Sequence, residues 1–352
     1  MCDEPNGSTT FAVEPFGCVS GFNNVKIIFM LEETIKNFPK QLDYEPVIEN
    51  AGGFGKHNKF IVCGMGGSNL AAGIIKSWKP KLDIIIHRDY GLPEMEEEKL
   101  KDYLVIASSY SGNTEETISG FEEALARGLP LIVVTAGGKL LEMAQEKEVP
   151  CIQIPKIDGN PRFAIGLSIR ATLKAMGEES ILNDLSGLTK SLESDDYQRI
   201  GGELAEKLQN KIPVICSSGS NAGLARYWKI SFNETAKLPA FYNFIPELNH
   251  NEMVGFSSQI FDSKLNHKFA LVFLNDPDDE PQVQKRMVIT KKILEDREFT
   301  VLDVDLVGPS LWHKSFVGIL TAMWTSHFLA EHYGVDPEDI SMIEDFKRSL
   351  TS

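Results

Sequence analysis

Short apolar runs alternate with longer amphipathic stretches along most of this chain. Short runs rich in Val, Ile and Leu are typical of strands buried on both faces of a parallel sheet. In the first half, strands are predicted at Lys59–Cys63, Leu82–His87, Tyr103–Ser109, Leu131–Thr135 and Cys151–Ile154. The stretches between them have the length and pattern of helices, and together they predict a parallel sheet covered by helices.

The same pattern starts again after a connecting helical region at Gly159–Gly187. Strands are predicted at Ile212–Cys216, Lys268–Asn275 and Phe299–Val304, and helices at Ala222–Lys237, Val283–Glu295 and Phe316–Tyr333. We therefore expect an α/β fold of two similar subdomains, each a doubly wound, flavodoxin-like parallel sheet flanked by helices. The expected divisions are an N-terminal lead-in at 1–24, a first subdomain at 25–190, and a second at 191–352 that includes a C-terminal helix.

Composition and charge narrow the functional classes. With 352 residues, 42% of them hydrophobic and 24% charged, the chain is neither largely disordered nor collagen-like. Its 50 acidic and 35 basic residues give a net charge of −15, which argues against nucleic-acid and anionic-membrane partners. No apolar run reaches the ~18 residues of a membrane span, and Met1–Ser20 does not resemble a secretory signal. The five cysteines are widely spaced, as in a reducing compartment. A cytoplasmic protein is expected.

Two loops rich in small hydroxyl residues are the strongest chemical lead. Gly64–Ser68 and Ser109–Thr114 each lie between a predicted strand and a predicted helix. Ligands of parallel sheets bind at that edge, and the amino end of a helix favours an anion. The hydroxyl groups that could contact phosphate oxygens belong to Ser68, Ser109, Ser111 and Thr114. Ordinary helix capping by the same residue types is the alternative.

Standard nucleotide and metal motifs are missing from the sequence. Asn69 stands where a dinucleotide fingerprint requires its third glycine, and no G-x-x-x-x-G-K-[S/T] string occurs. There is no H-E-x-x-H and no Cys/His cluster. A hydroxyl loop without a lysine suits a phosphomonoester better than a nucleoside triphosphate. We therefore expect a site that needs neither a metal nor another cofactor.

Several strings together resemble the bifunctional phosphoglucose/phosphomannose isomerases of the sugar isomerase (SIS) superfamily. The resemblance covers about residues 25–350. The strings are Gly-Met-Gly-Gly-Ser at 64–68, Ser-Tyr-Ser-Gly-Asn-Thr-Glu-Glu-Thr at 109–117, Pro-Arg at 161–162, Asn-Glu-Thr-Ala-Lys at 233–237, Pro-Glu-Leu-Asn-His-Asn-Glu at 246–252 and Gly-Val-Asp-Pro at 334–337. The hydroxyl loop alone indicates only a sugar-phosphate-binding SIS domain, whereas the string at 246–252 is more specific.

The resemblance implies two SIS subdomains, a homodimer, and an enzyme that interconverts glucose 6-phosphate and mannose 6-phosphate with fructose 6-phosphate. It assigns the 6-phosphate to Gly67, Ser68, Ser109, Ser111 and Thr114. It assigns Glu234 as the base that moves a proton through a cis-enediol, and Arg162 to a place beside the reacting carbons. His250 would assist ring opening from the partner subunit, and Lys347 would line the site. By spacing alone, Glu234, His250 and Lys347 are each unremarkable.

Two parts of the chain depart from the family pattern. The lead-in at 1–24 has no evident counterpart, and Asp336–Ile340 looks variable, so no hexose-selecting residue is assigned there. An isomerase for glucose 6-phosphate alone, or another SIS sugar-phosphate isomerase, remains an alternative. A sugar-phosphate-sensing regulator is less favoured, because no convincing helix pair for DNA binding precedes Lys59.

Overall fold

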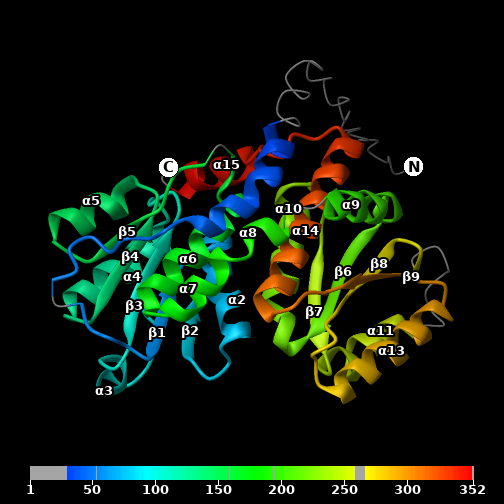
Figure 1. Ribbon diagram of the computed structural model, residues 1–352, viewed down its shortest axis with the longest axis horizontal. Helices are drawn as coiled ribbons and strands as arrows, with labels where there is room; N and C mark the ends of the chain where they lie inside the picture. Colours follow the sequence, from blue (N-terminus) through cyan, green and yellow to red (C-terminus); the bar gives the residue numbers. More distant parts are fainter. Residues whose placement is uncertain (1–29, 53, 158, 193–194, 258–265, 351–352) are drawn as a thin grey trace, which may run out of the picture.

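Two parallel sheets lie side by side in the computed structural model of the chain (Figure 1). The structure describes residues 30–52, 54–157, 159–192, 195–257 and 266–350. The expected lead-in at 1–24 lies outside these residues. Residues 30–37 are helical.

The first sheet has five strands, all parallel, in the order β2-β1-β3-β4-β5. The strands are β1 (Lys59–Cys63), β2 (Asp83–His87), β3 (Leu104–Ser109), β4 (Leu131–Thr135) and β5 (Cys151–Gln153). This is the flavodoxin-like order, which confirms the expected doubly wound topology. Every residue of β3 and β4 is buried, as expected for strands that helices cover on both faces.

The second sheet has four parallel strands in the order β7-β6-β8-β9. They are β6 (Ile212–Ser218), β7 (Phe241–Ile245), β8 (Phe269–Asn275) and β9 (Thr300–Asp305). The sequence did not predict β7, which lies at the edge of the sheet. Only Ile245 of this strand is buried, while Phe241, Tyr242 and Phe244 are exposed. Without a buried apolar run, the edge strand lacks the pattern that identified the others.

Helices and short 3-10 turns connect the strands and cover their faces. In chain order they are η1 (Phe38–Asp43), η2 (Gly66–Asn69), α2 (Leu70–Trp78), α3 (Glu97–Leu100), α4 (Glu115–Ala126), α5 (Gly138–Glu146), η3 (Pro161–Ala164), α6 (Ile165–Met176), α7 (Glu179–Ser186), α8 (Thr189–Leu192), α9 (Asp195–Leu208), η4 (Gly219–Asn221), α10 (Ala222–Glu234), η5 (Glu247–His250), α11 (Glu252–Phe256), α13 (Pro281–Glu295), α14 (Leu311–Tyr333) and α15 (Ser341–Leu350).

Two helix ends differ from the prediction for local reasons. Helix α10 ends at Glu234 rather than at Lys237, because Pro239 disfavours helical backbone just before it and Lys237 adopts a left-handed φ of 55°. Helix α14 begins at Leu311 instead of Phe316, because the Ser310 side chain accepts a hydrogen bond from His313 N and so caps the helix earlier.

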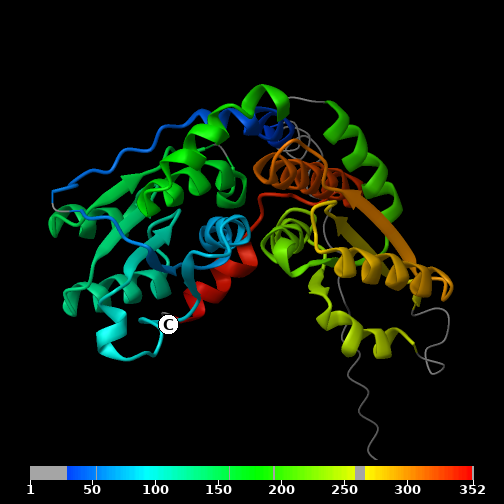
Figure 2. The same cartoon turned by 60° about the horizontal axis from the view of Figure 1, so that its bottom comes forward.

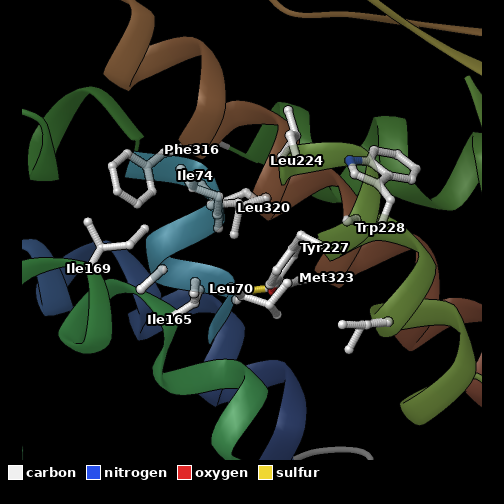
Figure 3. Close-up of a cluster of buried hydrophobic side chains, with 14 of the residues drawn as sticks. Leu70, Ile74, Ile165, Ile169, Leu224, Tyr227, Trp228, Phe316, Leu320 and Met323 are labelled. Carbon is white, nitrogen blue, oxygen red and sulfur yellow. The ribbon is translucent and has the colours of Figure 1, made fainter. Parts of the chain in front are cut away.

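Helices α2, α6, α10 and α14 form a continuous apolar core between the two sheets (Figures 2 and 3). The side chains that meet there include Leu70, Ile74, Ile165, Ile169, Leu224, Tyr227, Trp228, Phe316, Leu320 and Met323. All are buried. The two halves therefore share this core, and each half has a smaller buried cluster of its own as well.

The antiparallel helices α2 and α10 cross at a pair of glycines. A Cβ atom added to Gly223 would lie 2.6 Å from the backbone oxygen of Gly73. The two backbones are thus in direct contact, and only glycine allows this approach. The crossing brings the amino end of each helix toward the carboxyl end of the other.

Three cysteines, Cys63, Cys151 and Cys216, are buried and free, and burial raises the pKa of Cys63 to about 12. Within the described ranges, no helix has the length and apolar character that would let it cross a membrane.

The glycine crossing predicts that Gly223→Ala destabilises the protein. Overpacking against a backbone typically costs about 1–3 kcal/mol, and urea unfolding measures it. The control is Gly202→Ala inside α9, where the added Cβ would make only an ordinary 3.6 Å contact with Phe328. That variant should gain roughly 0.5–1 kcal/mol, because alanine favours helix over glycine. Equal effects of the two substitutions would contradict a close crossing.

Candidate functional site

Three loops meet at the carboxyl edge of the first sheet. Ser68 joins two of them, because its Oγ accepts a hydrogen bond from Tyr110 N at 3.0 Å and its carbonyl accepts one from Ser108 Oγ at 3.0 Å. Gly67 lies against the third, since a Cβ added to it would be 3.7 Å from the Arg162 backbone. The structure therefore brings Gly67, Ser68, the Ser109–Thr114 loop and Arg162 together.

The hydroxyl groups of the Ser109–Thr114 loop do not cap the helix that follows. Ser109 Oγ lies 2.8 Å from Thr114 Oγ1 and accepts a hydrogen bond from Gly112 N at 3.1 Å. Ser111 Oγ accepts one from Asn113 N at 3.3 Å. Thr114 occupies the N-cap position of α4, yet its side chain makes no capping hydrogen bond. Capping therefore does not explain these hydroxyls, and the amino end of α4 remains open to an anion.

Arg162 is the central charged group of the site. It is only 2% exposed. Its Nε donates to Thr235 Oγ1 at 2.8 Å, its Nη1 pairs with Glu234 Oε2 at 3.3 Å, and its Nη2 donates to the Pro337 carbonyl. Burial lowers the pKa of Arg162, and the Glu234 carboxylate opposes that shift. One guanidinium thus links η3, the end of α10 and the segment before α15.

Glu234 is the last residue of α10, and its side chain is 33% exposed. The Arg162 ion pair orients the carboxylate while that exposure leaves it accessible to a ligand. Next to it, Lys237 Nζ donates to the carbonyls of Glu234 at 2.7 Å and Asp339 at 2.5 Å. Burial, together with the nearby charge of Arg162, lowers the pKa of Lys237.

The sequence did not identify Thr235 or Lys237 as parts of the site. Both lie in the string at 233–237 that also carries Glu234, so their proximity in sequence was the available signal. Lys156 was missed as well. It lines a cavity of about 450 Å³ that also includes Ser111, Asn113 and Gly137, so a cation does lie near the hydroxyl loop. The expectation of a loop without a lysine holds for the loop itself but not for its surroundings.

His250 lies far from Glu234 within one chain. Glu234 precedes β7, and His250 follows it at the end of η5, where it is exposed. The five residues of β7 span about 16 Å. Glu234 consequently lies toward the amino end of β7, and His250 lies toward its carboxyl end.

Lys347 lies on α15, a helix with no buried residue. Although α15 follows the second sheet in sequence, it lies on the side of the first sheet (Figures 1 and 2). The segment that leads into it contacts Arg162 through Pro337 and Asn160 through the Glu338 carbonyl. The site and the C-terminal helix are thus connected, and no hydrogen bond within the described residues joins Lys347 to Glu234.

The Ser/Gly loop of the second half is closed by its own Ser218 and by carboxylates from the segment that follows β8. Ser218 Oγ accepts a hydrogen bond from Asn221 N at 3.2 Å, which is ordinary capping. Asn221 Nδ2 also lies 3.2 Å from Asp276 and 3.4 Å from Asp279, and Lys314 pairs with Asp276 at 2.5 Å. These two buried carboxylates, one of which Lys314 pairs with, disfavour an anion at Asn221. Burial, with a contribution from Asp276, raises the pKa of Asp279 to about 6.

Nowhere in the described ranges do three or more His, Cys, Asp or Glu side chains form a group that could hold a metal ion. We define the candidate site by three features described above. They are the open hydroxyl loop, the Arg162–Glu234 pair and the contacts of Lys237. Its residues can bind a phosphate group at one end and hold a carboxylate beside a fixed cation at the other.

Comparison with known proteins finds similarity to one group of sugar-phosphate isomerases. Residues 198–350 match the family model of the bacterial phospho-glucose isomerase C-terminal SIS domain. The chain is 34% identical over 329 residues to the bifunctional phosphoglucose/phosphomannose isomerase of Aquifex aeolicus, covering 90% of this chain and 97% of the relative. It is 33% identical to the protein of the same name from Caldicellulosiruptor bescii, covering 90% of this chain and 98% of the relative.

A solved structure supports the fold alone. The C-terminal domain of glucosamine-fructose-6-phosphate aminotransferase from Francisella tularensis superimposes with a TM-score of 0.64 at 13% identity. The alignment covers 90% of this chain and 98% of that domain.

The closed loop of the second half predicts a pH-dependent stability. Because the pKa of Asp279 is raised in the folded state, that state binds more protons than the unfolded chain between about pH 4 and pH 6. The free energy of unfolding therefore falls as pH rises through this window. Asp279→Asn should raise the melting temperature at about pH 7.5 and have a smaller effect at about pH 4.5.

Calorimetry at both pH values measures this difference. The control is Asp184→Asn on α7, an exposed position where little change is expected at either pH. An Asp279→Asn shift of the same size at both pH values would mean that this carboxyl titrates normally.

Proposed function

Since the chain belongs to the bifunctional phosphoglucose/phosphomannose isomerase family, we propose that it interconverts fructose 6-phosphate with both glucose 6-phosphate and mannose 6-phosphate. It is an aldose–ketose isomerase of sugar phosphates. The observation that carries the proposal is the pairing of Glu234 with the buried Arg162, next to an open hydroxyl loop. We further propose that residues 25–190 and 191–352 are the two SIS subdomains.

The hydroxyl loop binds the 6-phosphate. Gly67 and Ser68 supply one wall, and the other hydroxyls come from Ser109, Ser111 and Thr114. The uncapped amino end of α4 adds backbone N–H groups and a positive potential. Lys156 contributes a further positive charge at the adjoining cavity.

Glu234 moves the proton. Its carboxylate takes the proton from C2 of the open-chain aldose and returns it to C1, through a cis-enediol intermediate. Arg162 stabilises the negative charge that develops on the sugar oxygen. Its guanidinium is held in advance by Thr235 and Pro337, so little reorganisation is needed during the reaction.

The enediol explains how one site could serve two aldoses. Glucose 6-phosphate and mannose 6-phosphate differ only in configuration at C2, and the enediol has lost that configuration. Reprotonation of C2 from either face then yields either sugar phosphate. An isomerase restricted to glucose 6-phosphate would require a site that lets the proton return to C2 from only one face of the enediol.

Ring opening is assigned to His250 of a second subunit in a homodimer. An imidazole can donate and accept protons near neutral pH. Within one chain, the length of β7 separates His250 from Glu234, so the partner subunit would have to supply the histidine. Lys347 on the exposed helix α15 is proposed to line the same site.

We expect Glu234→Gln to abolish isomerisation while substrate still binds. The amide retains the shape of the carboxylate but cannot accept a proton, and loss of a general base costs roughly 10²–10⁴-fold in rate. Coupled assays with glucose 6-phosphate and mannose 6-phosphate measure turnover. Exchange of the C2 hydrogen in deuterated water measures proton removal directly.

The matched control is Glu206→Gln, an exposed position on α9 that should keep full activity. Near-normal C2 exchange in Glu234→Gln would assign the base to another residue. Wild-type activity with glucose 6-phosphate and none with mannose 6-phosphate would favour the single-substrate isomerase.

Subunit mixing tests the role of His250. Glu234→Gln and His250→Ala proteins should each be inactive alone. After exchange, about half of the dimers are mixed, and each mixed dimer has one intact site and one doubly defective site. About a quarter of wild-type activity should therefore return. If verified exchange restores no activity, both residues act within one chain.

A further inference from the structure

A second cavity lies at the opposite end of the α2–α10 helix pair from Glu234. Its volume is about 460 Å³, and it is lined by α2, α10 and the edge strands β2 and β7 of the two sheets. We call it the basic cavity because the charged residues that line it are Lys76, Arg88 and Arg226, with no carboxylate among the described residues of its lining. Gly223 at the cavity lies about 16 Å along α10 from Glu234.

The positive charges of the basic cavity are poorly compensated. Arg88 makes no ion pair within the described part of the chain, although acidic residues outnumber basic ones by 50 to 35 overall. Arg226 is half-buried, and its pKa is lowered first by burial and then by the charge of Arg88. The two guanidinium groups therefore repel each other, and an anion bound between them would reduce that repulsion.

Neutral groups around these charges also favour an anion. Gly219, Ala222 and Gly223 line the cavity with main-chain atoms and small side chains, so they leave room for a ligand beside the cations. Ser220 and Tyr242 bring hydroxyl groups to the same lining. Lys76 Nζ is held by the Ile84 carbonyl at 2.8 Å, so its charge has a fixed position.

We propose that the basic cavity binds a phosphorylated small molecule as a second site, separate from the hydroxyl loop that binds substrate. Its volume is in the range of pockets for small ligands, roughly 300–1,000 Å³. The paired guanidinium groups and the hydroxyl donors match phosphate oxygens in charge and hydrogen-bonding capacity. The proposal does not depend on the identity of the reaction.

A hydrogen bond connects this cavity to the substrate loop. Arg226 Nη1 donates to Asn69 Oδ1, and Asn69 Nδ2 donates to the Gly64 carbonyl at 2.7 Å. Asn69 directly follows Ser68 in the loop. A ligand that draws Arg226 toward the cavity therefore loosens the loop, and its binding should raise KM without changing kcat.

Equilibrium dialysis with inorganic pyrophosphate tests the proposal. The wild-type protein should bind two pyrophosphates per chain. The double variant Lys76→Gln/Arg88→Gln should weaken one of the two sites at least about tenfold, because two of three cations are lost. Ser109→Ala/Thr114→Ala should weaken the other. The double variant Lys101→Gln/Lys285→Gln, which removes two exposed charges elsewhere, should keep both sites.

Kinetics provides a second measurement. Without pyrophosphate, Lys76→Gln/Arg88→Gln should retain the kcat and KM of the wild type. Its residual inhibition by pyrophosphate should then come from the substrate loop alone, and it should disappear when Ser109→Ala/Thr114→Ala is added to the same chain. Because dialysis does not depend on turnover, a failure of the proposed isomerase activity would leave the binding result unaffected.

Two results would overturn the proposal. One is a single pyrophosphate site per chain that Ser109→Ala/Thr114→Ala removes and Lys76→Gln/Arg88→Gln preserves. The other is a change of oligomeric state in Lys76→Gln/Arg88→Gln, measured by sedimentation, because the charges would then serve a contact between subunits.

Discussion

The buried guanidinium of Arg162 is the constraint on which the rest of the site depends. A buried charge is stable only when its hydrogen-bonding groups are satisfied and an opposite charge is near. Here the partners come from two distant parts of the chain, at Glu234 and Thr235 and at Pro337. Both halves and the C-terminal segment must therefore be in place before Arg162 is satisfied, so assembly of the site and completion of the fold are coupled.

Each half has a Ser/Gly loop that leads from a strand into a helix, but only one of the two loops is open. In the first half, Thr114 does not cap α4, and the donors at that helix end remain available. In the second half, Asp276 and Asp279 supply negative charge from within the protein. A repeated architecture thus provides one substrate-phosphate loop per chain, because the protein has neutralised the other with its own carboxylates.

The sequence predicted much of the fold and part of the site. Strands such as β3 and β4 are buried on both faces and have a distinctive apolar pattern, whereas the exposed edge strand β7 has none. The hydroxyl loop could be located because local motifs at strand ends have a known position in parallel sheets. The contacts of Arg162 could not be located in this way, because its partners are 72 to 175 residues away. The closure of the second Ser/Gly loop could not be predicted either, because Asp276 and Asp279 come from a different segment of the chain.

The segment Asp336–Ile340 holds the site through main-chain atoms. Arg162 contacts the carbonyl of Pro337, Lys237 contacts that of Asp339, and Asn160 contacts that of Glu338. Every residue type has a carbonyl group, so these contacts constrain the path of the backbone but not the identity of the side chains. Substitutions here can reshape the wall beside Glu234 while its alignment with Arg162 is kept. In evolution or in protein engineering, substrate preference can therefore diverge at this segment without rebuilding the catalytic pair.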